Sequence, residues 1–365
     1  MARFEDVLTI VNGKNQKKVE NPNGLYPIYG SGGIMGYADD YICEANTVVI
    51  GRKGSINNPI FVETRFWNVD TAFGLCADTS KLEPKYLYYF CDNYDFERLN
   101  TTVTIPSLTK RNLLKIEIPL PSLDEQRRIA ATLDKVTDLI TKRRQQLDKL
   151  DELVKARFVE MFGDTVINPH ELPSVCLSNF ADIVSGITKG RKTSGEELFE
   201  VPYMAVSNVK SGYIDWTTVK TIEATKSEIE QYRLQSFDVL MTEGGDPDKL
   251  GRGAIIQNPP IDCIHQNHIF RVRVDSSRLL PQYLEEYLQH PKAKKYFLSC
   301  AKQTTGIASI NMTQLRNLPV LLPSLEQQKQ FSAIVEQIDQ HKLTIQRSLD
   351  KMETLKKALM QQYFD

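Results

Sequence analysis

The sequence predicts an α+β protein with two globular domains, each built on a curled, mostly antiparallel sheet. Between them run two long helices that form an antiparallel coiled coil, and the whole chain is an internal pseudo-two-fold repeat. Three observations predict this: an ungapped self-match, two helical apolar seams of roughly forty residues without Pro or Gly, and short β-branched runs elsewhere.

Length and composition are those of an ordinary globular protein. With 365 residues the chain can hold two or more domains, each with its own core. No apolar run is long enough to cross a bilayer, and "MARFEDVLTI" lacks the order of a signal peptide. Six well-separated cysteines without a CxxC pair predict reduced thiols and a cytoplasmic location. The net charge of −1 argues against nucleic-acid binding by charge alone.

The repeat is clearest where "PLPSLDEQRRI" at residues 119–129 returns as "LLPSLEQQKQF" at residues 321–331. The match continues without a gap until Phe162 aligns with Phe364. An ungapped match of this length indicates a chain built from two related halves.

Each copy of this motif is expected to begin a long helix. Ser122 and Ser324 are suited to N-caps, and an acidic-plus-Gln run follows each of them. A narrow apolar seam requires a partner helix, and the other copy is the nearest candidate; packing of each helix on its own globular domain is the alternative. The seams are interrupted at Arg143 and Lys342, which would both lie near the middle of an antiparallel pair.

The rest of the chain has the character of β-sheet domains. We expect strands at "NTVVIG", "NPIFVE", "VPYMAVS", "FDVLMT", "GAIIQ" and "HIFRVRV", and short helices after "DTSKLE" and "DSSRLL". The predicted order is a globular domain (residues 1–120), a long helix (121–163), a second globular domain (164–322) and a second long helix (323–365).

The sequence offers no catalytic residue and no metal site. "NPPI", Asn258 to Ile261, is similar to a methyltransferase loop, but Ile261 cannot stack on a flipped base and no cofactor loop precedes it. A turn between strands is therefore favoured. Cys263 and His265 would share one face of a strand and His268 the other, which favours a structural or DNA-facing role over metal binding.

The two helix starts, together with "YPIYGSGGIMGYADDYICEANTVVIGRKGSI" and "VPYMAVSNVKSGYIDW…FDVLMTEGGDPDKLGRGAII", resemble the specificity subunit of type I restriction–modification systems over the whole chain. The resemblance implies two DNA-recognition domains held apart by the helix pair. The implied partners are double-stranded DNA, two adenine-N6 methyltransferase subunits and restriction (translocase–nuclease) subunits, with no membrane. No cofactor is expected in this chain; S-adenosylmethionine, ATP and Mg²⁺ would bind the partner subunits.

The resemblance implies a non-catalytic function in which each globular domain reads one half of an asymmetric, bipartite DNA target. The helix pair would set the gap between the two half-sites and dock the adenine-N6 methyltransferase subunits. We assign Leu123, Gln126, Leu325 and Gln328 to this docking. A coiled-coil scaffold that binds only proteins is the alternative. A self-contained nuclease would require metal-binding carboxylate motifs that are not found in the sequence.

DNA contacts are expected from polar loop residues, because base edges need paired donors and acceptors and phosphates need Lys, Arg, hydroxyls or amides. In the first domain the candidates are Lys14, Tyr29, Ser31, Gly32, Arg52, Lys53, Ser55, Asn57, Thr102, Thr104, Lys110 and Arg111. In the second domain they are Lys189, Arg191, Lys192, Glu243, Asp246, Lys249, Arg252, Gln266, Asn267, His268, Gln303 and Thr304. The recognised bases cannot be deduced.

Overall fold

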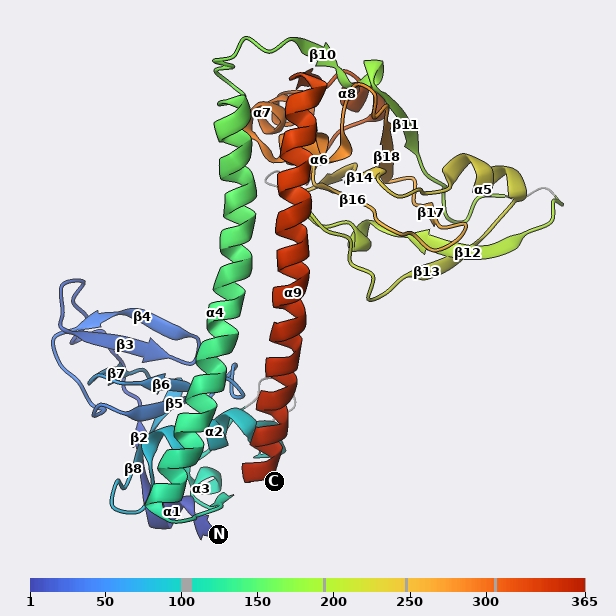
Figure 1. The fold of residues 1–365 in the computed structure, drawn as a ribbon. Helices are drawn as coiled ribbons and strands as arrows, with labels where there is room; N and C mark the ends of the chain where they lie inside the picture. Colours follow the sequence, from blue (N-terminus) through green and yellow to red (C-terminus); the bar gives the residue numbers. More distant parts are fainter. Residues whose placement is uncertain (100–106, 193–194, 247–248, 305–306, 365) are drawn as a thin grey trace. The chain divides into compact units, whose positions relative to one another are not determined.

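The computed structural model describes residues 1–99, 107–192, 195–246, 249–304 and 307–364, and Figure 1 labels its elements. The fold is α+β, as predicted. The chain divides into two compact units: unit 1 is Met1–Gln146 with Ile345–Asp365, and unit 2 is Leu147–Thr344. Within the described residues, no helix has the length and apolar character needed to span a membrane.

Unit 1 contains a four-stranded sheet of order β2-β8-β5-β6 and a three-stranded sheet of order β4-β3-β7. All neighbours pair antiparallel except β3 and β7, which are parallel. The strands are β1 (Ala2–Arg3), β2 (Leu8–Asn12), β3 (Tyr26–Gly30), β4 (Gly33–Ala38), β5 (Thr47–Gly51), β6 (Ile60–Val62), β7 (Trp67–Asn68), β8 (Ala72–Ala77) and β9 (Glu117–Ile118). The short helices are α1 (Phe4–Val7), α2 (Pro84–Asn93), η1 (Phe96–Leu99) and α3 (Lys110–Leu113).

Unit 2 repeats this plan with sheets of order β11-β18-β14-β16 and β13-β12-β17, and it also contains a small β15-β20-β19 sheet. Its strands are β10 (Ser174–Cys176), β11 (Ala181–Ser185), β12 (Phe199–Met204), β13 (Lys220–Ala224), β14 (Val239–Thr242), β15 (Gly244–Gly245), β16 (Gly253–Ile255), β17 (Ile264–His265), β18 (Ile269–Val274), β19 (Lys302–Thr304), β20 (Ile307–Ser309) and β21 (Pro319–Leu321). Its helices are η2 (Leu177–Asn179), η3 (Val206–Asn208), α5 (Lys226–Tyr232), α6 (Pro281–Gln289), α7 (Pro291–Cys300) and α8 (Met312–Arg316).

The two long helices match the sequence repeat residue by residue. α4 (Leu123–Phe162) and α9 (Leu325–Phe364) have 40 residues each and occupy equivalent positions of the repeat. Ser122 Oγ accepts from the amide of Glu125, and Ser324 Oγ accepts from that of Gln327, both at 3.3 Å. These bonds and helix bounds confirm the predicted helices and N-caps. A capping hydroxyl satisfies one of the free amides in the first turn of a helix.

Within each unit the helices pack antiparallel. In unit 1, Leu133 near the start of α4 shares a core with Phe364 at the end of α9, and Arg144 pairs with Glu353 at 2.6 Å. In unit 2 the order is reversed: the end of α4 meets the start of α9 through a core that contains Phe158 (Figure 1). Lys342, one of the two predicted interruptions of the seam, forms an ion pair there with a carboxylate of α4.

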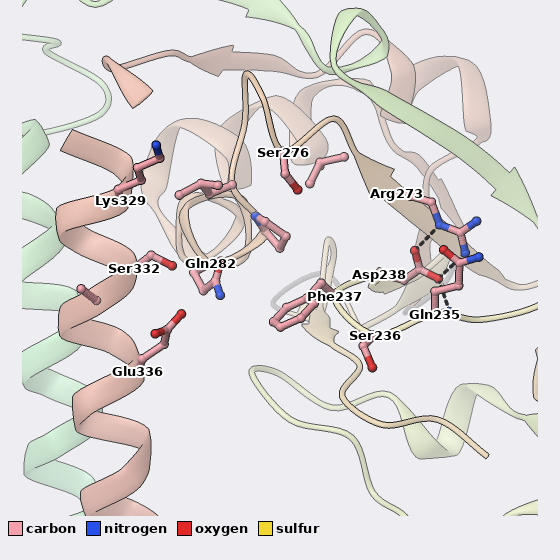
Figure 2. Close-up of a pocket in the computed structure, with 14 residues that line it drawn as sticks. Gln235, Ser236, Phe237, Asp238, Arg273, Ser276, Gln282, Lys329, Ser332 and Glu336 are labelled. Carbon is pink, nitrogen blue, oxygen red and sulfur yellow. Dashed lines mark hydrogen bonds and ion pairs between the residues drawn. The ribbon is translucent and has the colours of Figure 1, made fainter. Parts of the chain in front are cut away.

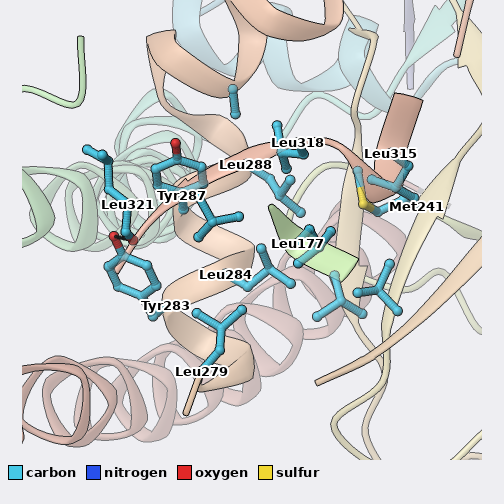
Figure 3. Packing of buried hydrophobic residues seen from close by; sticks show 14 of the residues in the cluster. Leu177, Met241, Leu279, Tyr283, Leu284, Tyr287, Leu288, Leu315, Leu318 and Leu321 are labelled. Atoms are coloured by element: carbon cyan, nitrogen blue, oxygen red, sulfur yellow. Dashed lines mark hydrogen bonds between the residues drawn. The ribbon is translucent and has the colours of Figure 1, made fainter. Parts of the chain in front are cut away.

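The core of unit 2 is built around one face of α6. Figure 3 shows Leu284 and Leu288 facing Leu177, whereas Tyr283 and Tyr287 face the strand β21. The two tyrosine hydroxyls donate to backbone carbonyls of Leu321 and Pro319, both at 2.6 Å. Each ring is therefore buried with its only polar atom satisfied, which makes the contact favourable. Unit 1 repeats it with Tyr86, whose hydroxyl donates to Pro119 at 3.0 Å.

A buried glutamine connects each long helix to its globular domain. The amide nitrogen of Gln126 donates to the carbonyls of Lys81 (3.0 Å) and Pro121 (2.9 Å), and its oxygen accepts from the amide of Glu83 (2.9 Å). Gln328 repeats the pattern. Neither side chain is exposed, so contact with a partner subunit would require these bonds to open; Leu123 and Leu325 are partly buried.

Replacing Gln328 by Ala is expected to lower the free energy of unfolding by about 2–4 kcal/mol. The change leaves three buried backbone groups unpaired and opens a cavity. Chemical denaturation followed by circular dichroism measures the loss. Gln330→Ala, at an exposed position of the same helix, is the control. Equal stability of the two variants would contradict the role given to Gln328.

Stability should also depend on Glu285 of α6. Burial raises the pKa of this carboxyl to about 7, and its oxygen accepts from the amide of Ile255 at 2.7 Å. The folded state keeps the proton on Glu285 to higher pH than the unfolded chain does. The free energy of unfolding therefore falls as the pH rises toward and through 7.

Glu285→Gln, which keeps the acceptor and cannot ionise, should therefore stabilise the protein at pH 8 by up to about 3 kcal/mol and change it little at pH 5. Thermal unfolding at both pH values tests this. The exposed Glu326→Gln serves as the control. A shift of the same size at both pH values would show that ionisation is not the cause.

Candidate nucleic-acid interface

The predicted contact loops of unit 1 meet around the turn that joins β7 and β8, residues 68–71. Backbone atoms of this turn accept from the amides of Lys14 (2.8 Å) and Arg52 (2.8 Å), and donate to the carbonyl of Tyr29 (3.0 Å). Three loops that are far apart in sequence therefore converge at one edge of the domain. We call these loops, which contain Lys14, Tyr29, Arg52 and residues 68–71, the unit 1 edge.

Two more segments join the unit 1 edge. The amide of Leu108 donates to the carbonyl of Arg52 at 2.9 Å, and Lys53 forms a bridge with Ser107. A Cβ atom on Gly51 would lie 2.2 Å from a backbone oxygen of Ser55, so only glycine fits where these loops cross.

Unit 2 has a matching edge. The amide of Gln266 donates to Met204 (3.0 Å), that of Ile187 donates to His265 (2.8 Å), and that of Glu243 donates to His268 (2.9 Å). These are the counterparts of the three bonds of unit 1. The turn between β17 and β18 thus takes the place of the β7–β8 turn. We call the loops that meet at this turn, which contain Ile187, Met204, Glu243 and Gln266, the unit 2 edge.

The fourth bond fixes the correspondence of residues. The amide of Ile310 donates to Glu243 at 2.9 Å, as Leu108 does to Arg52, and Leu108 aligns with Ile310 in the sequence repeat. Glu243 is therefore the structural equivalent of Arg52, and by the same bonds His268 is the equivalent of Thr71. The two edges share one backbone framework and differ in their side chains.

A close backbone approach occurs at the same place in both edges. A Cβ on Gly13 would lie 2.9 Å from the carbonyl oxygen of Asn68 and 1.8 Å from that of Val69. A Cβ on Gly186 would lie 2.0 Å and 2.7 Å from the equivalent oxygens of His265 and Gln266. Both positions exclude any larger residue. The glycine at this position in both units is a second, independent indication that the two edges have the same backbone structure.

Most predicted contact residues of unit 1 lie at its edge, but some serve the fold. Lys14, Gly32, Arg52, Lys53, Ser55 and Arg111 are exposed, and Tyr29 and Ser31 are partly buried. Asn57 instead bonds to Asp95 (3.1 Å) and the amide of Phe96 (2.8 Å), and Lys110 Nζ donates to the carbonyl of Ile10 (2.7 Å). Thr102 and Thr104 lie outside the described residues.

In unit 2 several candidates form ion pairs within the domain. Arg191 pairs with Glu228 of α5, and Lys249 pairs with Asp246. Lys189 and Lys192 are exposed, and Arg252 is partly buried.

The "HQNH" segment forms the turn itself. Gln266 accepts from the amide of Val206 at 3.3 Å, and the carbonyl of Asn267 accepts from Ser185 at 2.6 Å. The side chains of Gln303 and Thr304 in β19 lie outside the part that the structure describes.

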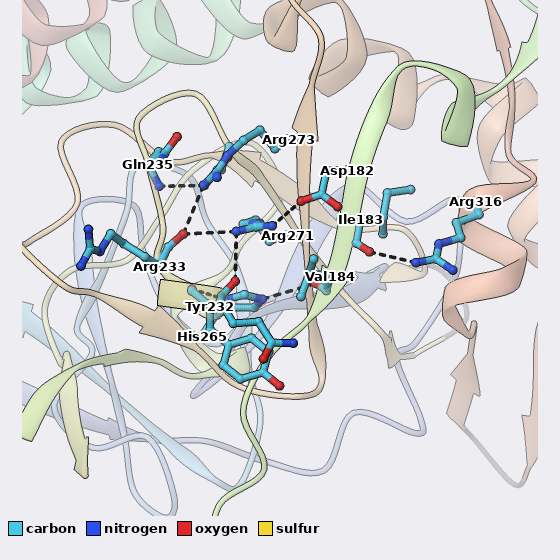
Figure 4. Close-up of polar contacts among 12 residues, drawn as sticks. Asp182, Ile183, Val184, Tyr232, Arg233, Gln235, His265, Arg271, Arg273 and Arg316 are labelled. Atoms are coloured by element: carbon cyan, nitrogen blue, oxygen red, sulfur yellow. Dashed lines mark hydrogen bonds and ion pairs between the residues drawn. The ribbon is translucent and has the colours of Figure 1, made fainter. Parts of the chain in front are cut away.

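A polar network around the buried side chains of Arg271 and His265 supports the unit 2 edge (Figure 4). Arg271 donates to Asp182 (2.5 Å) and to the carbonyl of Arg233 (3.3 Å), and His265 contacts the carbonyl of Tyr232 at 3.1 Å. Burial lowers the pKa of His265 to about 4, so this ring is neutral at physiological pH. The network fixes the loop after α5 against β17, which carries the turn.

The two segments considered above as catalytic or metal motifs occupy a turn and the region around β17. Asn258 has a positive φ of 48° in a turn, and Ile261 is 88% exposed. Cys263 and His265 are both fully buried, whereas His268 is exposed. No cluster of potential metal ligands occurs among the residues that the structure describes.

Unit 2 also contains a cavity of about 510 Å³ that no sequence motif predicted. Figure 2 shows Phe237 projecting toward it, opposite Lys329 and Glu336 of α9. Phe237 has a φ of 74°, a conformation that aromatic residues rarely adopt, and it is 51% exposed. The equivalent residue of unit 1 is Asn46, also with a positive φ. The cavity contains none of the predicted contact residues.

Comparison with known proteins finds relatives of one family. The family model for the type I restriction modification DNA specificity domain matches residues 1–151 and 170–354. The MjaVIII specificity subunit of Methanocaldococcus jannaschii is 26% identical over 99% of this chain and 90% of its own length. The EcoKI specificity subunit of Escherichia coli is 25% identical over 64% of this chain.

The chain spans 53% of the length of the EcoKI subunit. The putative MjaX specificity subunit of Methanocaldococcus jannaschii is 31% identical over 164 residues, and the chain spans 39% of its length. Among solved structures, the S subunit of a type I restriction–modification system from M. genitalium has a similar fold. Its TM-score is 0.64 at 16% identity, and the match covers 100% of this chain and 95% of that one.

Proposed function

We infer the function of this chain from one premise: the chain belongs to the type I restriction–modification DNA specificity domain family. We propose that it is the non-catalytic subunit that gives such a complex its DNA sequence specificity. Each globular domain would read one half of an asymmetric, bipartite DNA target through the edge defined above.

One observation carries this proposal: the two edges share a backbone framework and carry different side chains. A framework held by matching hydrogen bonds presents its loops in the same way to a ligand in both domains. Related domains that read DNA through the same surface bind related half-sites. Because Arg52 is replaced by Glu243, and Thr71 by His268, the two half-sites should be unlike.

The near-neutral charge of the chain suits a subunit that shares its DNA with partners. Non-specific affinity for DNA comes mainly from Lys and Arg contacts with phosphates, and a net charge of −1 supplies little of it. We propose that two adenine-N6 methyltransferase subunits dock on the long helices and hold the duplex. S-adenosylmethionine would bind those subunits, and ATP and Mg²⁺ would serve the complete complex with its restriction subunits.

A coiled-coil scaffold that binds only proteins remains the second candidate, since helix pairs also occur in such scaffolds. The exposed Arg52 and Lys53 at a loop edge favour DNA, because these side chains match phosphates and guanine.

The deciding experiment is methylome sequencing of cells that express the methyltransferase subunit with or without this chain. We expect N6-methyladenine at one bipartite target, only when the chain is present. Methylation of the same sites without the chain, or no site-specific methylation with it, would refute the proposal. Copurification of the methyltransferase without any methylated target would favour the scaffold.

A further inference from the structure

We propose that Arg52 and Glu243 are matched specificity-determining residues, one in each domain. Arg52 would contact a guanine of the first half-site, and Glu243 would accept from the amino group of a cytosine in the second. This inference rests on the proposed function and deepens it by assigning one base pair in each half-site.

The two side chains leave their domains at the same place. Both residues follow the last residue of an equivalent core strand, β5 in unit 1 and β14 in unit 2. Ile50 and Met241, two positions earlier, both lie in the cores that contact the long helices. Since side chains alternate along a strand, Arg52 and Glu243 point to the same side, just beyond the core.

Arg52 has the chemistry of a guanine contact. Its side chain is exposed, and its guanidinium lies 5.7 Å from the centre of the Phe73 ring. Among the described residues no carboxylate forms an ion pair with it. The planar group can therefore present its paired donors to the O6 and N7 acceptors of guanine.

Glu243 has the opposite chemistry at the same position. Its Oε2 lies 2.6 Å from Nδ1 of His268, and this contact orients the carboxylate. Its Oε1 has no hydrogen-bond partner within the described part of the chain. The side chain is 33% exposed and that of His268 is 58% exposed, so both are accessible to a ligand.

A carboxylate on a DNA-facing edge requires a specific purpose, because phosphates repel it. The exocyclic amino group of cytosine is the donor that Glu recognises in the major groove. The exchange of a donor for an acceptor at one shared position thus predicts that the two half-sites differ there in the base they present.

The test uses the full chain with its methyltransferase subunits and a library of randomised target sites, scored by methylation. Glu243→Gln and Arg52→Gln are compared with the wild type, because Gln pairs with adenine N6 and N7. Glu230→Gln and Arg98→Gln make the same charge changes at exposed positions of α5 and η1, outside the two edges and the long helices.

We expect Glu243→Gln to shift the preference at one base pair of the second half-site from C·G toward A·T by about tenfold or more. Arg52→Gln should shift one base pair of the first half-site from G·C toward A·T. Both control variants should keep the wild-type target. Uniformly weaker methylation without a change of preference, or a change in the other half-site, would overturn the inference.

Two conservative variants keep the inference testable should a Gln variant unfold. Glu243→Asp and Arg52→Lys retain the acceptor and the donor, so they should retain the base preference at lower affinity; an altered preference would refute the assignment. If the wild-type complex itself methylates without a bipartite preference, the proposed function fails before the variants are compared.

Discussion

Replacing residues 174–321 by the equivalent domain of another specificity subunit is expected to change one half of the DNA target completely and leave the other half unchanged. The two ends of the exchanged segment lie side by side, because β10 pairs with β21 and Ser174 lies opposite Leu321. The domain therefore enters and leaves through adjacent strands. Methylome sequencing of cells that express the chimaera would give the new target.

The reciprocal exchange of residues 2–118 is the matched control. β1 and β9 pair with Ala2 opposite Ile118, so the first domain has the same type of joint. This chimaera should change only the other half of the target. If either exchange altered both half-sites, the domains would not be independent readers.

Adding four residues to each long helix, after Arg144 in α4 and after Gln346 in α9, is expected to abolish methylation of the original target. A related target with a longer gap should replace it. Four residues extend a helix by about 6 Å, which corresponds to about two base pairs of B-DNA. Both helices need the insertion because they pack antiparallel within each unit, where Arg144 pairs with Glu353.

Two controls accompany the insertion. Replacing four exposed residues of α4 without changing its length should leave the target unchanged. An insertion in α4 alone should lower the melting temperature, since it puts the two apolar seams out of register. An active complex with both insertions and the original gap would show that the helices do not set the spacing.

The long helices could be predicted because their signals are local. A cap such as Ser122, an acidic first turn and a periodic apolar seam all lie within the segment that they describe. The turn at Asn258 was predictable for the same reason. The starts of α2 and α6 follow from proline, which fits the first turn of a helix.

The assembly of the edges could not be predicted, because strand pairing joins distant residues. Nothing in the sequence around Arg52 indicates that it meets Thr71 and Leu108. The role of Asn57 in holding η1 was missed because a polar loop residue looks the same whether it binds a ligand or the fold. The burial of Gln126 was missed because an amide in a first helical turn is usually exposed.

The buried glutamines have a consequence for how these proteins evolve. In the globular domains, Gln126 and Gln328 bond only to backbone groups, such as the amide of Glu83 and the carbonyl of Arg278. Such a joint does not depend on the side chains of the domain that it holds. Recombination between genes can therefore install a domain of unrelated sequence without a compensating mutation in the helix, provided that its chain follows the same path.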